Sequence, residues 1–139
     1  MSSPPTDLAR ALRQVGDRWS LLLVEALMEG PKRFGDLQEA VPGIATNVLS
    51  QRLRQLESGR IVVAVPYNRR PVRYSYELSD EGRSLAGAVG MLSQWSAGRR
   101  GAAAGAPVHA ACGSQLELKW WCPTCDQPAI ADPEEVTWI

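Results

Sequence analysis

The sequence lacks any long hydrophobic run. Apolar residues make up 45% of its 139 positions, enough for a real core, but they never continue for the roughly 18 positions that a membrane-spanning helix requires. The opening stretch, MSSPPTDLARALRQ, also lacks the hydrophobic segment of a secretory signal. We therefore expect a folded protein that stays in the cytoplasm, with room for one ordinary domain and a small appendage.

Histidine is nearly absent as well, and its one occurrence lies close to all of the cysteines. His109, Cys112, Cys122 and Cys125 fall within a span of 17 residues. In a cytoplasmic protein such clustering indicates metal binding before disulfides, and an odd number of thiols cannot be fully paired within one chain. Since the sole histidine is then a ligand, no Ser/His/Asp set remains, and the sequence predicts that the protein is not an enzyme.

The spacing His-x2-Cys-x9-Cys-x2-Cys provides two ligand pairs separated by a hairpin-length segment, GSQLELKWW. This pattern is typical of tetrahedral structural zinc, whose binding energy of order 10 kcal/mol could stabilise a segment with few apolar residues. The alternative is a set of reduced cysteines without metal. Trp121 to Cys125 also resembles a thioredoxin-type redox site, but Pro128 and Pro133 oppose the helix that such a site requires.

The net charge is zero, which taken alone argues against a nucleic-acid binder. The distribution of charge changes that conclusion. From Arg52 to Arg73 six arginines stand against the single acid Glu57, whereas from Gly101 onward one lysine faces five carboxylates. The basic charge is therefore concentrated in the middle of the chain.

A helix is predicted over Ala45 to Glu57, because its apolar residues recur at helical spacing. Its other side carries amide, hydroxyl and guanidinium groups and no carboxylate before Glu57. Such groups match the base edges and phosphates of a DNA major groove. A short predicted helix, Asp36 to Val41, and a Pro42-Gly43 turn precede it, and together these segments indicate a helix-turn-helix.

Two strands, Ile61 to Tyr67 and Val72 to Leu78, are predicted next, joined by the basic turn Asn68-Arg69-Arg70-Pro71. A hairpin with cations at its tip can serve as a wing that lies along or in a minor groove. Further helices are predicted over 7–15, over 18–29 with Asp17 as the cap, and from a Ser79 cap to about residue 97. The fold class is mainly α with a small β-hairpin wing, a winged helix-turn-helix of the α+β type, plus a small metal-ribbon-like segment.

These features resemble the HxlR-type winged helix-turn-helix transcriptional regulators of bacteria. The resemblance covers about residues 7 to 97 and lies in ordered segments: VGDRWSLLLVEAL (15–27), GPKRFGDLQ (30–38), GIATNVLSQRLRQLE (43–57), PVRYSYELSDEG (71–82) and the late Trp95. It implies a homodimer whose first and last helices pack across the interface. Such a dimer binds a double-stranded DNA operator of two half-sites and often represses a neighbouring gene.

Three departures from the family pattern affect what can be transferred. Many members use a cysteine just before the first helix as a thiol sensor, whereas this chain has Pro5-Thr6-Asp7 there, so that mechanism is not carried over. Ala45 stands where the family usually has a serine cap, whose loss costs about 0.5 to 2 kcal/mol, so Thr46 is expected to cap instead. The C-terminal extension is the third departure, since many members lack it.

The expected DNA contacts lie on the polar helix face and the wing: Thr46, Asn47, Ser50, Gln51, Arg52, Arg54, Asn68, Arg69, Arg70 and Arg73. Arg52 and Arg54 remain open between phosphate contacts and surface solvation. The expected dimer interface consists of apolar residues from the first and last helices: Leu8, Leu12, Leu85, Val89, Leu92 and Trp95. A pocket for an unknown small-molecule effector between the dimer helices is a further hypothesis.

The predicted domain organisation has four parts: a disordered N-terminus (1–6), the winged helix-turn-helix (7–97), a Gly/Ala-rich linker (98–107) and a zinc-ribbon-like extension with its tail (108–139). An alternative function is a winged-helix protein-interaction module that binds a protein partner through the C-terminal ribbon. Its tryptophans Trp120, Trp121 and Trp138 would then form a partner surface instead of packing within the appendage.

Overall fold

A computed structural model describes residues 5–98, 107–129 and 136–137 of the chain. The chain divides into two compact units, Met1–Val89 and Gly90–Ile139, and the division falls inside helix α6 (Ala86–Gly98). Most of the expected linker, 98–107, and the first four residues of the expected disordered N-terminus lie outside the described residues. Each unit is taken separately below.

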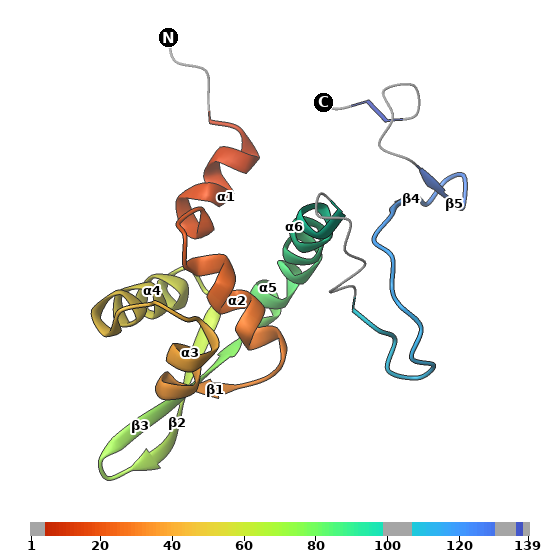
Figure 1. Ribbon diagram of the computed structural model, residues 1–139. Helices are drawn as coiled ribbons and strands as arrows, with labels where there is room; N and C mark the ends of the chain where they lie inside the picture. Colours follow the sequence, from red (N-terminus) through yellow and green to blue (C-terminus); the bar gives the residue numbers. More distant parts are fainter. Residues whose placement is uncertain (1–4, 99–106, 130–135, 138–139) are drawn as a thin grey trace. The chain divides into compact units, whose positions relative to one another are not determined.

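The first unit packs helices around a small antiparallel sheet (Figure 1). Its elements, in chain order, are α1 (Asp7–Val15), α2 (Ser20–Met28), β1 (Lys32–Arg33), α3 (Phe34–Ala40), α4 (Thr46–Ser58), β2 (Val62–Arg69), β3 (Val72–Leu78) and α5 (Asp80–Ser84). The strand order is β1-β3-β2, with Lys32 opposite Tyr76 and Val62 opposite Leu78. This arrangement confirms the predicted α+β winged helix-turn-helix.

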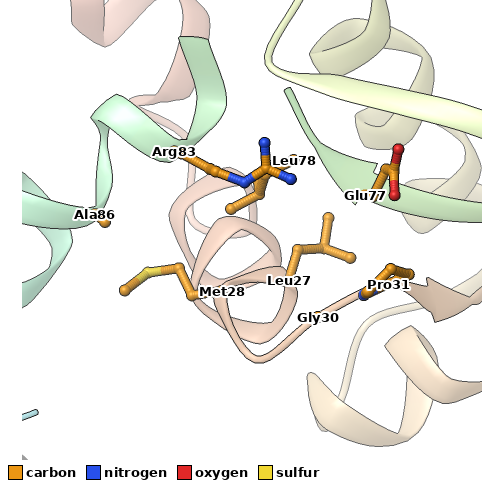
Figure 2. A pocket seen from close by; sticks show the side chains of 8 residues that line it. All are labelled: Leu27, Met28, Gly30, Pro31, Glu77, Leu78, Arg83 and Ala86. Atoms are coloured by element: carbon orange, nitrogen blue, oxygen red, sulfur yellow. The ribbon is translucent and has the colours of Figure 1, made fainter. Parts of the chain in front are cut away.

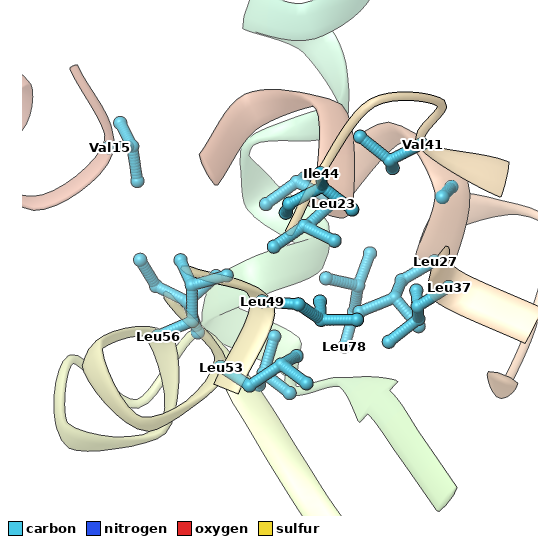
Figure 3. Packing of buried hydrophobic residues seen from close by; sticks show 14 of the residues in the cluster. Val15, Leu23, Leu27, Leu37, Val41, Ile44, Leu49, Leu53, Leu56 and Leu78 are labelled. Atoms are coloured by element: carbon cyan, nitrogen blue, oxygen red, sulfur yellow. The ribbon is translucent and has the colours of Figure 1, made fainter. Parts of the chain in front are cut away.

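Leucines from three helices form the centre of the core (Figure 3). Leu23 of α2, Leu37 of α3 and Leu49 of α4 are fully buried, as are Leu53 and Leu56 of α4. Burying each of these side chains contributes roughly 1.5 to 3 kcal/mol. Because the apolar side of α4 is held in the core, its polar side faces outward.

Helix α2 begins at Ser20, two residues later than the sequence predicts. Asp17 nevertheless acts on the start of this helix, since its Oδ1 accepts hydrogen bonds from the backbone N–H groups of Trp19 at 2.9 Å and Ser20 at 3.1 Å. Helix α3 begins two residues earlier than predicted, because the Asp36 carboxylate accepts a hydrogen bond from the Arg33 N–H at 2.9 Å. Both shifts follow from side chains that satisfy free N–H groups at a helix start.

The predicted continuous helix after Ser79 is wrong, because the structure interrupts it at Leu85. Ser79 caps α5 as expected and accepts a hydrogen bond from the Gly82 N–H at 2.9 Å. Gly82 lies against the backbone just before β2: a Cβ added there would be 2.1 Å from the carbonyl oxygen of Ile61. The Leu85 N–H then bonds to the Gly82 carbonyl at 3.1 Å, a three-residue spacing that ends α5 before α6 starts.

In its described part, the second unit contains most of α6, a short hairpin of β4 (Trp120–Cys122) with β5 (Gln127–Ala129), and an isolated bridge between Val108 and Gln115. Of the helices within the described ranges, none combines the length and apolar character needed to cross a membrane.

Candidate nucleic-acid interface

The outward side of α4 presents a polar surface that extends over its whole length. Thr46, Asn47, Gln51 and Arg54 are exposed, and Ser50 is half-buried. The backbone that carries them is fixed by the buried leucines on the opposite side. The structure therefore holds these hydrogen-bonding groups on a rigid helix, as base recognition requires.

The start of α4 differs from the expectation that Thr46 would cap it. Ala45 occupies the cap position with an extended backbone (φ −74°, ψ 147°), and Thr46 is the first helical residue. The Thr46 hydroxyl instead accepts a hydrogen bond from the Gln38 side-chain amide at 3.0 Å. Sequence reasoning missed Gln38, whose bond joins α3 to α4 across the turn of the helix-turn-helix.

Arg52 does not point freely away from the protein. Its Nε lies 3.3 Å from Oδ1 of Asp17, and its Nη1 donates to the Gln55 side chain at 2.6 Å. The Nε atom is buried and makes no hydrogen bond to any described residue, so the Asp17 contact is an ion pair with imperfect geometry. Arg52 thus joins α4 to the start of α2, a role that neither sequence interpretation included.

The carboxyl of Asp17 has a lowered pKa. Its partial burial would raise the value, but the hydroxyl of Ser20, the N–H groups of Trp19 and Ser20, and the nearby charge of Arg52 together outweigh that effect. A carboxyl with a lower pKa in the folded state stabilises the fold at pH values above its unfolded pKa. That contribution is lost as the pH falls through the folded value.

Asp17→Ala should therefore lower the free energy of unfolding by about 0.5 to 2 kcal/mol at pH 7, the range for losing a helix-start acceptor. The difference from the wild type should be smaller at pH 3, below the ordinary carboxyl pKa of 3.8, because the carboxyl of the unfolded chain is then largely protonated. Urea unfolding at both pH values measures it, with Glu39→Ala, an exposed change on α3, as control. An equal deficit at both pH values would contradict a role for the charge.

The hairpin of β2 and β3 forms the wing, and the arginines at its tip are exposed. Strand β2 continues to Arg69, which pairs with Val72, so the hairpin is longer than expected. Arg69, Arg70 and Arg73 are exposed, and the Asn68 side chain accepts a hydrogen bond from the Arg70 N–H at 3.2 Å. Asn68 therefore shapes the tip, while the arginines are available to a ligand.

Arg33 is a further exposed cation, and sequence reasoning missed it. Its guanidinium lies 4.4 Å from the centre of the Tyr67 ring, so it bridges the start of α3 and the wing. A cleft of about 420 Å³ lies at this junction, and Arg73 also lines it. The basic pair Lys32-Arg33 before a short helix was the available sequence signal.

A pocket of about 320 Å³ lies elsewhere in the first unit, where the end of α2 approaches β3 and α5 (Figure 2). Leu27 and Met28 face Arg83, with Glu77 and Pro31 on another side. This pocket is not at the position where the sequence led us to expect an effector site, between the dimer helices.

The expected dimer residues separate into two groups. Leu8 and Leu12 of α1 are exposed, and so are Leu92 and Trp95 of α6, with Trp95 at 63%. Val89, by contrast, belongs to the core of the first unit, and Leu85 packs against that core.

The four expected metal ligands form two pairs. His109 Nδ1 lies 3.3 Å from Cys112 Sγ, while Cys122 and Cys125 occur at the turn between β4 and β5. Over the described part of the chain, the structure gathers no three His, Cys, Asp or Glu side chains into a metal-binding group.

Hydrogen bonds affect these thiols. Bonds from the Ser114 side chain and backbone, then from His109, lower the pKa of Cys112 to about 7. The pKa of Cys122 is lowered chiefly by the Cys125 backbone N–H, and that of Cys125 is raised by its bond to Cys122.

A helix-turn-helix with an outward polar helix and an adjoining basic hairpin defines a winged-helix DNA-binding regulator. A sequence model of the HxlR-like helix-turn-helix family matches residues 14–102, and the chain belongs to this family. An uncharacterized HTH-type transcriptional regulator of Mycobacterium tuberculosis, Rv3095, is 35% identical over 127 residues, which cover 89% of this chain and 80% of Rv3095. The protein is thus an HTH-type transcriptional regulator. Members of this class are DNA-binding proteins and not enzymes.

Solved structures agree. The reduced form of the Bacillus subtilis transcriptional regulator YodB has a TM-score of 0.58 at 32% identity, covering 70% of this chain and 93% of YodB. The crystal structure of PA1607 has a TM-score of 0.79 at 30% identity and covers 97% of this chain and 96% of PA1607. The likeness to PA1607 therefore extends over nearly the whole chain, including the C-terminal unit, whereas the YodB match leaves 30% of the chain uncovered.

Proposed function

We propose that the protein is a repressor that binds, as a homodimer, to an operator with two half-sites. The observation that carries this proposal is the exposed face of α4, which has no carboxylate before Glu57, beside a wing with three exposed arginines. A solvated helix face of ordinary composition would mix both signs of charge.

Base recognition is assigned to the first half of α4, because the N-terminal residues of a recognition helix enter the major groove. The amides of Asn47 and Gln51 suit the two-point pattern of adenine, and Thr46 and Ser50 add hydroxyl groups. Contacts to phosphates or to the minor groove are assigned to five arginines: Arg33, Arg54, Arg69, Arg70 and Arg73. Arg52 acts through its ion pair, which sets the position of α4.

Dimerisation is assigned to the exposed apolar residues of α1 and α6. A two-fold dimer of this kind reads half-sites whose centres are about 34 to 36 Å apart, one turn of DNA. Gel-shift titration against the upstream DNA of the protein's own gene, together with light scattering of the purified protein, tests both parts. A monomer, or binding that unrelated competitor DNA abolishes, would contradict the proposal and favour the protein-interaction module.

Arg69→Ala should weaken binding to all DNA sequences alike, since a phosphate contact carries no base information. Each lost phosphate contact should reduce the slope of log affinity against log salt by about 0.9. Affinities measured from 50 to 200 mM salt give this slope. Arg83→Ala is the control, because Arg83 is an exposed arginine on α5 whose guanidinium pairs with Asp80 at 3.0 Å. An Arg69 variant with the wild-type slope would remove the wing from the mechanism.

The pocket in Figure 2 is the proposed site for a small-molecule effector. Its volume is at the lower end of the range for such sites, and Glu77 and Leu78 in its lining belong to β3 of the wing. A ligand there would contact the DNA-binding hairpin directly. We expect a screened compound that binds this pocket to release the protein from its operator. The same compound should not release the Met28→Trp variant, whose larger side chain occupies the pocket.

A further inference from the structure

Two turns in the C-terminal unit have the same construction. We call His109 to Gly113 the first knuckle and Cys122 to Asp126 the second knuckle. In the first, the Gly113 N–H donates to the His109 carbonyl at 2.8 Å, and in the second the Asp126 N–H donates to the Cys122 carbonyl at 2.9 Å. Both closing residues have left-handed backbones, with φ of 70° at Gly113 and 54° at Asp126. A repeated turn of this kind presents two side chains, three positions apart, to one side.

The side chains presented by each knuckle are soft metal ligands. In the first knuckle His109 Nδ1 lies 3.3 Å from Cys112 Sγ. Tetrahedral zinc, with Zn–N of about 2.0 Å and Zn–S of about 2.3 Å, places such a pair of ligand atoms about 3.6 Å apart. The first knuckle is therefore already close to the geometry of half a zinc site.

The left-handed backbone of Asp126 needs a reason, because non-glycine residues seldom adopt a positive φ. Closing a ligand turn provides one.

The described residues from 107 to 129, which surround the knuckles, form no apolar core of their own. Every described residue from 107 to 129 is exposed or half-buried, including both tryptophans of β4. A segment that buries so little cannot offset the conformational entropy of ordering it, unless a metal or another link is added.

We propose that the two knuckles together hold one structural Zn²⁺ per chain, through His109, Cys112, Cys122 and Cys125. The described structure does not gather these four side chains, so binding must bring the second knuckle onto the first. The nine residues from Gly113 to Trp121 connect the knuckles and are enough for a hairpin between them. Four protein ligands leave no open coordination position, so the metal orders the segment and performs no catalysis.

The test uses the full chain purified under reducing conditions without added metal. Elemental analysis should find about one zinc per chain. Cys125→Ser and Cys112→Ser, one from each knuckle, should each lower that content at least fivefold, while Lys119→Ala, an exposed change between the knuckles, should leave it unchanged. Cobalt replacing zinc should show thiolate-to-metal absorption that both cysteine variants lose.

Three results would overturn the proposal: wild-type zinc below about one-fifth per chain, one zinc for every two chains, or full metal content in either cysteine variant. Thiol titration after removal of the metal should find three free thiols. Finding one would show a disulfide in place of the metal site. Helical circular dichroism, dominated by the first unit, shows whether the variants remain folded, and operator binding is measured separately.

Discussion

Gln51→Ala should lose discrimination between the operator and its single-base variants while keeping most of its affinity for unrelated DNA. Gln51 is exposed on α4, in its first half, where a two-point amide contact to adenine can form. Such a contact contributes about 1 to 3 kcal/mol of discrimination, or roughly 5- to 150-fold. Fluorescence anisotropy with the operator and a set of substituted operators measures the ratio, and the loss should be confined to one base pair per half-site.

Gln55→Ala is the matched control, since it removes the same side chain from the same helix. The Gln55 amide donates to the Gln14 carbonyl at 3.0 Å and its oxygen accepts from Arg52, so it is engaged within the protein. Its removal should leave the discrimination ratio unchanged. If Gln51→Ala keeps the wild-type ratio, or if both variants lose it equally, α4 does not read bases through Gln51.

Local pattern was sufficient to predict α4 and the wing. The leucines of α4 recur at helical spacing because one side of the helix is buried, and the alternation in Val72 to Leu78 reflects a strand with two different faces. The same periodicity indicated which side of α4 is free. Residue type and position therefore predicted most of the candidate DNA surface.

Contacts between distant segments could not be predicted in this way. Asp17 and Arg52 are 35 positions apart, and their ion pair depends on the fold that brings α4 to the segment just before α2. Gln38 reaches Thr46 because the turn between two helices has one particular geometry. The sequence around these four residues contains no pattern that indicates either contact.

The apolar stripe after Ser79 shows that helical periodicity alone does not predict where a helix is interrupted. Leu85, Val89, Leu92 and Trp95 share one helical stripe in the sequence, but Val89 is buried in the core while Leu92 and Trp95 are exposed. The close approach of Gly82 to the Ile61 backbone accompanies the interruption of the helix, and a helical pattern contains no information about a neighbouring strand.

Leu53→Ala should give the largest loss of stability, about 2 to 5 kcal/mol in the free energy of unfolding. Leu53 is 1% exposed and packs in the core on the side of α4 opposite its polar face, so its truncation leaves a cavity there. Urea unfolding measures the change. Leu22→Ala, the same substitution at a 41% exposed position of α2, should cost less than about 1 kcal/mol.

The same variant separates folding from recognition. Leu53 contributes no atom to the exposed face of α4, so the fraction of Leu53→Ala that is folded should retain the wild-type preference for the operator. Saturating operator DNA should also raise its unfolding midpoint, because a ligand that binds only the folded state stabilises it by mass action. The contrary result would be a loss of discrimination at a temperature where circular dichroism shows the variant to be folded. The core would then set the position of the polar residues on α4, in addition to stabilising the fold.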